Sequence, residues 1–517
     1  MFQRYSVVAL LLTSTITFAQ HPTGGTDHWA AFLVNAYGDD ARRVLITAAG
    51  PASGEVIMPL LGFSEGFDVH PGEVTVVQLP NGVQNPVWGA GEEGIHITSD
   101  ARVSVQLESV RSFTSDVSQL LPADRTGNSY VVNCYAGMPG VAGLYGSEFV
   151  VVAQADSTQV EIIPSAAMSD GHAAGSAFTV WLNAGGTWMG RSAAEGGDLT
   201  GTVVRGGPEN APEKNFSVYA GAMCAATPSN CAACDHYFEQ QLPVAEWSLA
   251  YLAPAVDGLT SYSVRVLAQE DGTWVEIDGQ APVQLDAGQW HELNGLAAGV
   301  CITATKPVAV NRYMEGYQCA SMGDPSQIGL MPVSSPITQA TFSAPDQDQI
   351  EQHSITITAA MSDFGDVSLD GVPLVQLPTA YAECSDRGYV TVPIGAGAHE
   401  LSCPSGCQAQ VQGLATGQSY AFSLMQGAIA QQIAATGLEE EGEESPSLIF
   451  DHVSRRLIWP ASVSPFQVEL RDLSGRLVYT ARASGTTGIR LPSLPPGLYV
   501  ALAQGPTGSA SGKFMVP

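Results

Sequence analysis

Two cysteines, followed directly by an aspartate and a histidine, form the part of this sequence that is richest in reactive side chains. Cys231, Cys234, Asp235 and His236 lie in PSNCAACDHYFEQQLP, residues 228–243. Thiolate and imidazole groups at this spacing can bind zinc, and a Cys-x-x-Cys pair can act as a redox dithiol. In an oxidising compartment the same thiols are more often joined in disulfides. The cellular compartment therefore decides between these three chemistries.

The N-terminus predicts export. It reads MFQRYSVVALLLTSTITFAQ, with a positive charge at Arg4 and an apolar run over 7–12 that is too short to span a bilayer. Thr17 and Ala19 stand at the small-residue positions of a cleavage site, so residues 1–19 have the pattern of a secretory signal peptide. No later apolar segment reaches the roughly twenty residues of a transmembrane helix. We expect a secreted or cell-surface protein.

Export favours disulfides for the nine cysteines of the chain. The cysteines expected to take part are Cys224, Cys231, Cys234, Cys301, Cys319, Cys384, Cys403 and Cys407. Because nine is an odd number, at least one thiol is free or paired between chains. Which of Cys224, Cys231 and Cys234 is left over, and whether it bonds to the ninth cysteine, Cys134, or to another partner, is open.

Several pairings with short loops are open. Cys224 can bond to Cys231 or Cys234, and a local bond is also expected for Cys301–Cys319. Cys403 has two candidate partners, Cys384 and Cys407. Zinc held by Cys224, Cys231, Cys234 and His236 is the weaker alternative, because zinc sites of this kind usually have two spaced cysteine pairs and this chain has one. Redox catalysis is weaker still.

Four polar residues accompany the cysteines. We expect Asp235, His236, Glu239 and Gln240 to form a network that fixes the cysteine-rich loop. That loop is then a candidate edge of a binding surface.

Charge excludes one class of partner. Acidic residues outnumber basic ones 50 to 20, which gives a formal charge of −30. Nucleic-acid binding depends on a basic surface, so we expect no nucleic-acid partner.

Motifs for catalysis are missing from the sequence. We find no nucleophile elbow, HExxH helix, Walker loop or GxGxxG turn after a strand. GDPS (323–326) resembles self-cleaving Asp-Pro sites, but Ser326 stands where those sites carry histidine, and we expect a turn. The prediction is a protein without catalytic residues, cofactor or metal. The alternative is a secreted hydrolase of carbohydrate or peptide whose carboxylates meet only in the fold.

Strand patterns dominate from about residue 30 to the end. Alternating runs such as RVLITAA and SVRVLAQ are separated by glycine, asparagine and aspartate turns. Asp-Gly turns within 276–285 and 368–377 predict hairpins. The expected fold class is all-β: tandem packed β-sandwich-like modules followed by a small Ig-like β-sandwich domain at the C-terminus.

The strand pairs recur along the chain. FVVVAQADSTQVEIIP (149–164) matches YSVRVLAQEDGTWVEIDG (262–279), and a second element repeats between 94–109 and 300–316. The polar side chains of the ADST and EDGT turns are expected to bond to their own backbone, with calcium binding as the weaker alternative. Units of about a hundred residues have the size of β-sandwich domains. We expect 20–436 to hold three or four such modules.

A short acidic stretch separates these modules from the C-terminus. GLEEEGEESP, residues 437–446, has the composition of a solvated linker. Residues 447–517 then resemble the sorting domain of the bacterial type IX secretion system, through LRDLSGRLVY, LPSLPPGLYVAL and the closing GKFMVP. The Tyr-Pro-Asn-Pro element that often opens this domain is replaced by LIFDHVSRRLIWPA. The resemblance implies the type IX machinery as a partner and a sorting domain that is usually removed.

The main body resembles the N-terminal domain of the IgGFc-binding protein family. The matching blocks are GTDHWAAFLVNAY, GIHITSDARVSV, SEFVVVAQADSTQVEIIP, YAGAMCAATPSNCAACDHYFEQQLP, GYQCASMGDPSQIGLMP and GAHELSC. The resemblance implies a secreted, disulfide-bearing, β-rich binding or adhesion module with an extracellular glycan or glycoprotein ligand. It does not imply immunoglobulin binding by this chain.

Overall fold

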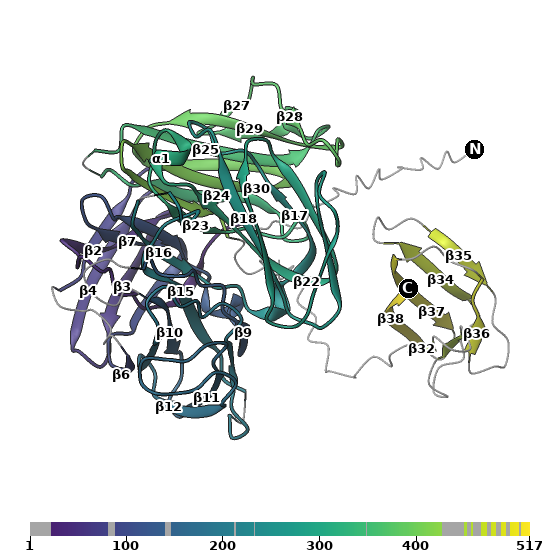
Figure 1. Cartoon of the computed structure of the whole chain (residues 1–517). Coiled ribbons are helices and arrows are strands. Elements are labelled where there is room, and N and C mark those ends of the chain that lie inside the picture. Colours follow the sequence, from purple (N-terminus) through teal and green to yellow (C-terminus); the bar gives the residue numbers. More distant parts are fainter. Residues whose placement is uncertain are drawn as a thin grey trace, which may run out of the picture. The chain divides into compact units, whose positions relative to one another are not determined.

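The computed structural model describes residues 22–80, 88–139, 146–210, 213–231, 233–347 and 349–425, together with the strands of a smaller unit within 449–516 and residues 491–492. The expected signal peptide (1–19) and acidic linker (437–446) lie outside the described residues. The chain divides between residues 431 and 432 into two compact units, each of which is described by itself (Figure 1).

The described residues form strands almost throughout, which confirms the all-β fold class. They include one four-residue α-helix and three short 3-10 turns. Within this part of the chain, no helix has the length and apolarity required to cross a membrane.

The larger unit contains four modules built in the same way. The first consists of β1 (Gly25–Ala30), β2 (Ala41–Thr47), β3 (Ala52–Met58), β4 (Phe63–Val69), β5 (Thr75–Gln78), β7 (Ile95–Val110) and β8 (Asp116–Gln119). The second consists of a 3-10 turn (Ala123–Arg125), β9 (Ser129–Val131), β10 (Ser147–Ala153), β11 (Thr158–Ile163), β12 (Phe178–Leu182), β13 (Thr187–Arg191), β14 (Val203–Gly206), β15 (Phe216–Ala225) and β16 (Asp235–Gln240), and β6 (Gly89–Gly91) is added at the edge of β13.

The third and fourth modules complete this unit. The third consists of a 3-10 turn (Val244–Glu246), β17 (Ser248–Ala253), β18 (Tyr262–Ala268), β19 (Thr273–Ile277), β20 (Val283–Leu285), β21 (Trp290–Leu296), β22 (Val300–Met314), α1 (Tyr317–Ala320) and β23 (Ser326–Gly329). The fourth consists of β24 (Ile337–Ala344), β25 (Gln352–Ala360), a 3-10 turn (Phe364–Asp366), β26 (Ser368–Leu369), β27 (Val372–Pro373), β28 (Thr379–Ala380), β29 (Arg387–Ile394), β30 (Gly397–Ala415) and β31 (Gln418–Ser423).

One long strand organises each module. The first half of β7 pairs with β1 and β3, and its second half pairs with β2 and β8, so that a single strand belongs to two sheets. The strands β22 and β30 have equivalent partners, and in the second module the same role is divided between β14 and β15. Apolar side chains between the two sheets give each module its own core. The resulting sandwich buries the inward face of every alternating strand.

The turns follow the chemistry read from the sequence. Asp370 and Gly371 have φ of 52° and 74° and join β26 to β27, the conformation of a tight hairpin turn. In the ADST and EDGT turns, the hydroxyls of Thr158 and Thr273 donate to nearby backbone carbonyls at 2.7 and 2.6 Å. The threonines therefore bond locally, as expected, whereas Asp156 and Asp271 accept from the amides of Ala184 and Ala287 at 3.1 and 2.9 Å. These turns do not close hairpins, because β10 does not pair with β11 and β18 does not pair with β19.

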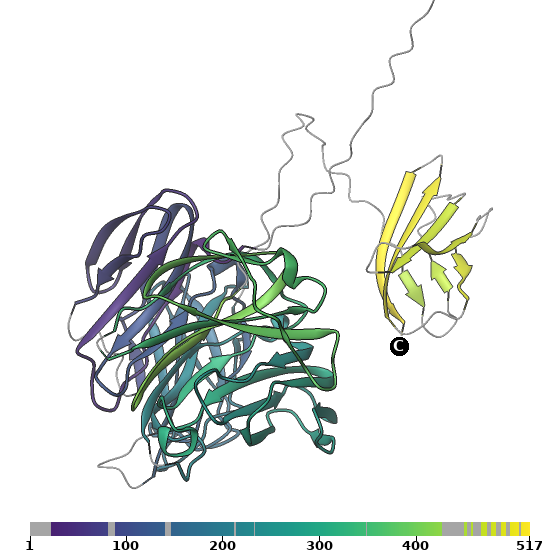
Figure 2. The same cartoon turned by 90° about the horizontal axis from the view of Figure 1, so that it is seen from above.

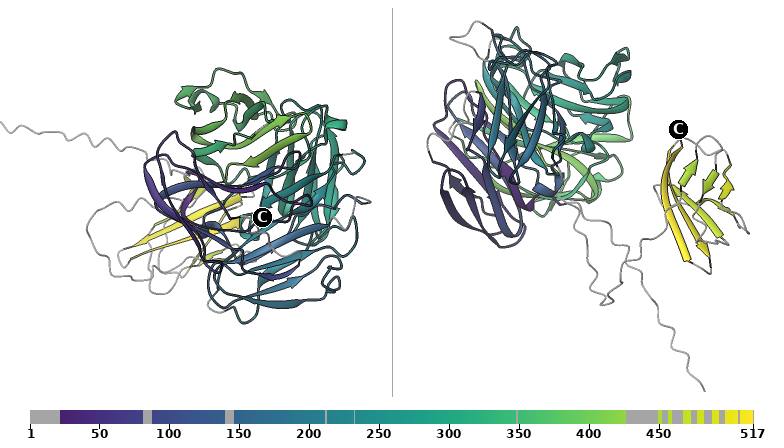
Figure 3. Two further views of the ribbon diagram at one scale, coloured as in Figure 1. Left: turned by 90° about the vertical axis from the view of Figure 1, so that its left-hand side faces the viewer. Right: turned by 90° about the horizontal axis from the view of Figure 1, so that it is seen from below.

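The four modules form a closed ring. The last strand of each module contacts that of the next, in the order β8, β16, β23, β31 and back to β8. Figure 3 (left) shows the purple, blue, teal and green modules following one another around this centre. The fourth module meets the first through two hydrogen bonds between Gln106 and the backbone of Ser343 at 3.1 and 3.0 Å. The Thr23 amide also donates to the Gln339 carbonyl.

The smaller unit is a two-sheet β-sandwich (Figure 2). One sheet contains β32 (Ile449–Asp451), β33 (Arg456–Ile458) and β36 (Gly488–Arg490), and the other contains β35 (Leu477–Ala481), β34 (Gln467–Asp472), β37 (Gly497–Gly505) and β38 (Gly508–Val516). Val468, Leu470 and Tyr499 are among its buried residues.

Candidate binding site at the mouth of the ring

The strands at the centre of the ring carry polar side chains that bond across the module boundaries. The Phe238 amide donates to Asp116 Oδ2 at 3.1 Å, and the Gln240 amide donates to Ser118 Oγ at 2.9 Å. Glu239 accepts from the Gly329 amide at 3.0 Å. These contacts hold β8, β16 and β23 around a common axis.

Three buried carboxyl groups lie in these central strands. Asp116, Asp235 and Glu239 are each 1% exposed or less. Burial raises the pKa of all three well above the ordinary range of carboxyl groups. Backbone amides and serine hydroxyls donate hydrogen bonds to them, and none of the three has an ion pair within the described residues. Burial therefore favours the protonated, uncharged form of these groups, which explains why they are stable without a cation.

One end of the axis is closed by apolar side chains. Leu121, Leu242, Met331 and Met425 form a cluster, and each is the second residue after the last strand of its own module. Because all four modules contribute an apolar residue at the equivalent place, the cluster completes the ring on that side.

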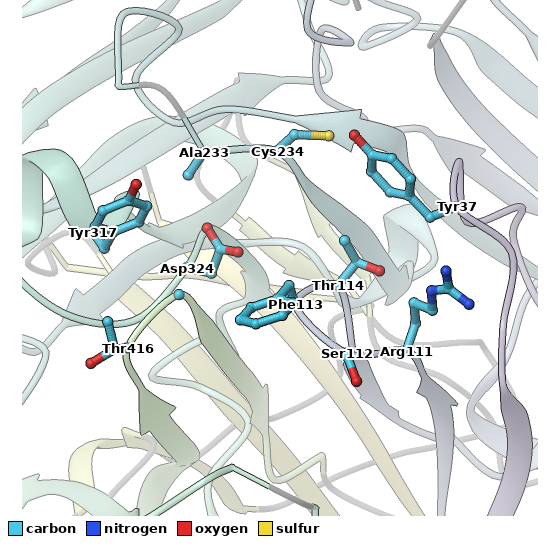
Figure 4. A pocket seen from close by; sticks show the side chains of 11 residues that line it. Tyr37, Arg111, Ser112, Phe113, Thr114, Ala233, Cys234, Tyr317, Asp324 and Thr416 are labelled. Carbon is cyan, nitrogen blue, oxygen red and sulfur yellow. The ribbon is translucent and has the colours of Figure 1, made fainter. Parts of the chain in front are cut away.

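The opposite end of the axis opens into a pocket of about 600 Å³. Its walls come from segments that precede the last strands of the four modules and from the β1–β2 connection, so no single module forms it. The lining residues are Tyr37, Arg111, Ser112, Phe113, Thr114, Ala233, Cys234, Tyr317, Asp324, Thr416 and Gly417 (Figure 4). This volume lies in the range of small-molecule binding sites.

Three aromatic rings at the pocket remain open to solvent. Tyr37, Phe113 and Tyr317 are 46%, 55% and 41% exposed. Phe113 has φ of 68°, a left-handed conformation that is costly for a bulky residue. A strained backbone that presents an exposed ring to a pocket is a feature of functional sites rather than of packing.

Disulfides fix the rim on the side of the cysteine-rich loop. Cys234 lines the pocket and bonds to Cys224 of β15, and Cys231 bonds to Cys319 of α1. The second bond joins the loop before β16 to the helix that begins at Tyr317. Two wall segments from different modules are thus covalently linked.

Asp324 supplies the carboxyl group of the pocket. It is 5% exposed, and its Oδ1 is buried without a hydrogen-bond partner. Burial raises the pKa of this carboxyl group to about 8. Ser419 Oγ accepts from the Asp324 amide and donates to its carbonyl at 3.3 and 2.6 Å, which fixes the backbone. Arg111, on another wall, forms an ion pair with Asp40 at 2.8 Å.

The four polar residues expected at an exposed loop are buried instead. Asp235, His236, Glu239 and Gln240 are all in β16 and at most 2% exposed. His236 lies 4.0 Å from Glu148, and burial lowers its pKa to about 4. Glu239 and Gln240 bond to neighbouring modules, whereas Asp235 accepts from the amide of His236 and the ring nitrogens of His236 have no hydrogen-bond partner. The four side chains do not form the edge of a binding surface, which corrects that expectation. They are buried because β16 lies at the centre of the ring.

All eight cysteines expected in disulfides are paired. The bonds are Cys224–Cys234, Cys231–Cys319, Cys301–Cys384 and Cys403–Cys407. Two of the local pairs considered, Cys224–Cys234 and Cys403–Cys407, are therefore present. The pairs Cys224–Cys231, Cys301–Cys319 and Cys384–Cys403 are wrong, because the fold brings together cysteines 83 and 88 residues apart. Cys134 is the free cysteine, and it is buried.

The disulfides also decide between the chemistries considered for the cysteine-rich loop. Cys224, Cys231 and Cys234 have no thiolate to offer a metal while their sulfurs are bonded. In the part of the chain that the structure describes, no group of three or more potential ligands is placed to hold a metal ion.

Of the residues that line the pocket, sequence reasoning singled out Cys234. Tyr37, Tyr317 and Asp324 stand in blocks that resemble the family but received no binding role there, and Phe113 lies outside those blocks. Position is the one available signal. Phe113 lies before β8, and Tyr317 and Asp324 lie before β23, and both are short last strands that repeat between modules.

Comparison with known proteins identifies relatives of this chain. A family profile described as IgGFc binding protein matches residues 116–413. The IgGFc-binding protein of Homo sapiens is 26% identical over 259 residues, which cover 48% of this chain and 4% of the human protein. The chain therefore spans a small part of that relative's length.

Solved structures add little. The Bacillus anthracis TIE protein aligns with 8% identity and a TM-score of 0.10, over 75% of this chain and 72% of that one. The N-terminal four Ig domains of Dscam1 isoform 8.4 align with 10% identity and a TM-score of 0.10, over 71% and 99%. Neither score establishes a shared fold. The family profile, in contrast, spans more than half of the chain, from β8 into β30, and the chain belongs to the IgGFc-binding protein family.

Proposed function

We propose that this chain is a secreted binding protein that acts without catalysis, and that its ligand occupies the pocket at the mouth of the ring. The observation that carries the proposal is the pocket itself. Its walls come from all four modules, its rim is held by disulfides, and it presents exposed aromatic rings around one buried carboxyl group. Family membership supports a role in binding.

The proposed ligand is the carbohydrate of a glycoprotein or polysaccharide. A sugar ring has an apolar C–H face that packs on an aromatic ring, and Phe113 and Tyr317 offer such surfaces. Sugar hydroxyls need polar partners in fixed positions, which Asp324, Thr114 and Thr416 can supply. This combination fits a carbohydrate better than an entirely apolar molecule.

The pocket supports binding better than hydrolysis. Glycoside hydrolysis generally requires two carboxyl groups that flank the scissile bond. Among the described lining residues, Asp324 alone has a carboxyl group. Asp235, whose pKa the charge of Asp324 raises further, lies in β16 and does not line the pocket.

The proposed route of export rests on the two ends of the chain. We propose that residues 1–19 direct passage across the inner membrane and that 447–517 direct passage through type IX machinery. Supporting the proposal, the three resembling blocks of the C-terminus include parts of β34, β35, β37 and β38. Expression in a type IX-competent bacterium, with and without 447–517, tests it. Equal appearance of both forms outside the cell would contradict the proposed sorting role.

A glycan-array measurement tests the function. Tyr317→Ala removes an exposed ring, and Phe113→Gly removes another at a φ where glycine is unstrained. Each variant should weaken binding to the selected glycan at least tenfold. Trp274→Ala is the matched control, because Trp274 is 48% exposed but does not line the pocket. Equal binding by all variants, or turnover of the glycan, would contradict the proposal.

A further inference from the structure

The acceptor at the floor of the pocket lacks a donor. Asp324 Oδ1 is buried and has no hydrogen-bond partner, and such a group is costly unless something binds it. Figure 4 shows the carboxyl group pointing into the pocket, with the rings of Phe113 and Tyr317 facing the same space. A ligand group that donates hydrogen bonds would complete this arrangement.

The surroundings favour a donor with positive charge. Asp116, Asp235 and Glu239 lie in the central strands, and burial holds them in the uncharged form, so Asp324 is the carboxyl group with which a ligand's positive charge can pair. The nearest cation among the lining residues, Arg111, is engaged by Asp40 at 2.8 Å. Exposed aromatic rings add attraction for an ammonium group through their π faces.

We propose that the pocket binds an amino sugar with a free ammonium group: the sugar ring packs against Phe113 and Tyr317, and the ammonium donates to the Asp324 carboxylate. The inference rests on the proposed carbohydrate-binding function and specifies its ligand. Neutral sugars cannot form this ion pair, and sugars with carboxylate or sulfate groups would be repelled by the ionised form of Asp324.

Binding also moves a proton. Asp324 is buried beside Asp235, which raises the free energy of its ionised form, and the ligand's ammonium reverses that effect. The proton on Asp324 therefore passes to solvent as the ion pair forms. The groups around this carboxyl are Asp235 of β16, Ser419 of β31, and Tyr317 and Arg111 of the pocket wall. Below pH 8, affinity for a permanently charged N-trimethylated glucosamine probe should rise with pH by up to about tenfold per unit.

Two oligosaccharides of equal length separate charge from shape. Titration calorimetry with the glucosamine trimer and the N-acetylglucosamine trimer, at pH 7, compares ligands that differ only at nitrogen. We expect the free amine to bind at least tenfold more tightly. Asp324→Asn keeps the side-chain size and should remove that preference.

A second variant provides an independent test in case Asp324→Asn does not fold. Thr416 is exposed at the pocket, and its backbone bridges to Gly323 next to Asp324. Thr416→Lys would supply a competing ammonium group and should also remove the preference, with Trp274→Ala as the unaffected control.

The possible outcomes test the amino-sugar inference, the assignment to a sugar and the proposed function separately. Equal binding of both trimers, unchanged by Asp324→Asn and weakened by Tyr317→Ala, would overturn the amino-sugar inference and keep carbohydrate binding. Equally tight, Asp324-dependent binding of a trilysine peptide would overturn the assignment to a sugar. If no glycan on the array binds, the proposed function itself fails.

Discussion

Asp324 is a carboxyl group that the fold removes from water while one of its oxygens lacks a partner. Within a protein core such a group would be a defect, but here it faces a pocket. Its neighbours Phe113 and Tyr317 are likewise unfavourable as packing residues, since one is strained and both are exposed. Ligand binding gives all three residues a common explanation.

The first prediction concerns the pH dependence that Asp324 imposes on stability. Burial raises its pKa from 3.8 to about 8. Between these values the native state keeps a proton that the unfolded chain loses, so the stability contribution is full near pH 4 and is lost as pH rises towards 8. The slope is up to about 1.4 kcal/mol per pH unit.

Asp324→Asn should remove this dependence. Urea unfolding of both proteins at pH 5, 6, 7 and 8 measures the effect, and the variant should gain relative stability at each step. If the two proteins differed in free energy of unfolding by the same amount at every pH, Asp324 would titrate in the native state much as it does in the unfolded chain, which would contradict the prediction.

Residues with reactive side chains could be found in the sequence, but their roles in the structure could not be predicted from it. The stretch 228–243 was chosen because cysteine, aspartate and histidine stand together, and it does end at the pocket through Cys234. Its remaining polar residues, Asp235 to Gln240, are buried instead. Spacing along a strand cannot show that both faces of that strand are covered, because the covering strands come from other modules.

At the scale of elements, the repeat explains what the sequence could predict. Alternating residues and Asp-Gly turns are local signals, so they predict the β19–β20 and β26–β27 hairpins without knowledge of the strands that flank them. Cysteine pairing is not local. Cys301 bonds to Cys384 of the next module rather than to Cys319, since the pairing depends on how modules meet.

The second prediction compares two disulfides of very different span. Cys231–Cys319 joins residues 88 apart, and Cys403–Cys407 joins residues 4 apart. The entropy of the unfolded chain predicts a stabilisation of about 4 to 5 kcal/mol for the first bond and about 2 kcal/mol for the second.

Paired serine substitutions at each bond test this order. Guanidinium unfolding should show the larger loss for Cys231→Ser with Cys319→Ser, and that variant should also lose affinity because the bond links two walls of the pocket. The Cys403→Ser with Cys407→Ser variant is the matched control and should keep its affinity. Loss of affinity in both would point to general unfolding.

At the scale of the whole unit, ring closure makes the modules depend on each other. The first and fourth modules are far apart in sequence, yet Gln106 and Ser343 exchange two hydrogen bonds. Glu108 also accepts from Gln347 at 2.8 Å. The module repeat was predictable from strand patterns, but the closed ring was not, because no local pattern shows that the last module meets the first.

The third prediction tests this closure. Gln106→Ala leaves the Ser343 amide and carbonyl without partners at a buried contact, at a cost of about 1–3 kcal/mol. Hydrogen exchange should quicken in β24 and β2, the elements that meet at the closure. The control Gln284→Ala, at an exposed position of β20, should change neither stability nor exchange. Faster exchange spread evenly over all four modules would contradict a local role.

The apolar cluster of Leu121, Leu242, Met331 and Met425 has a consequence for the form of the ligand. Because it closes the far end of the axis, a long polymer cannot be threaded through the ring and must approach from one face only. A pocket that is closed at one end binds chain ends, branches or sharply bent segments. Its affinity does not depend on how far the polymer extends beyond them. Short oligosaccharides should therefore compete with their parent polymers at similar molar concentrations of ends.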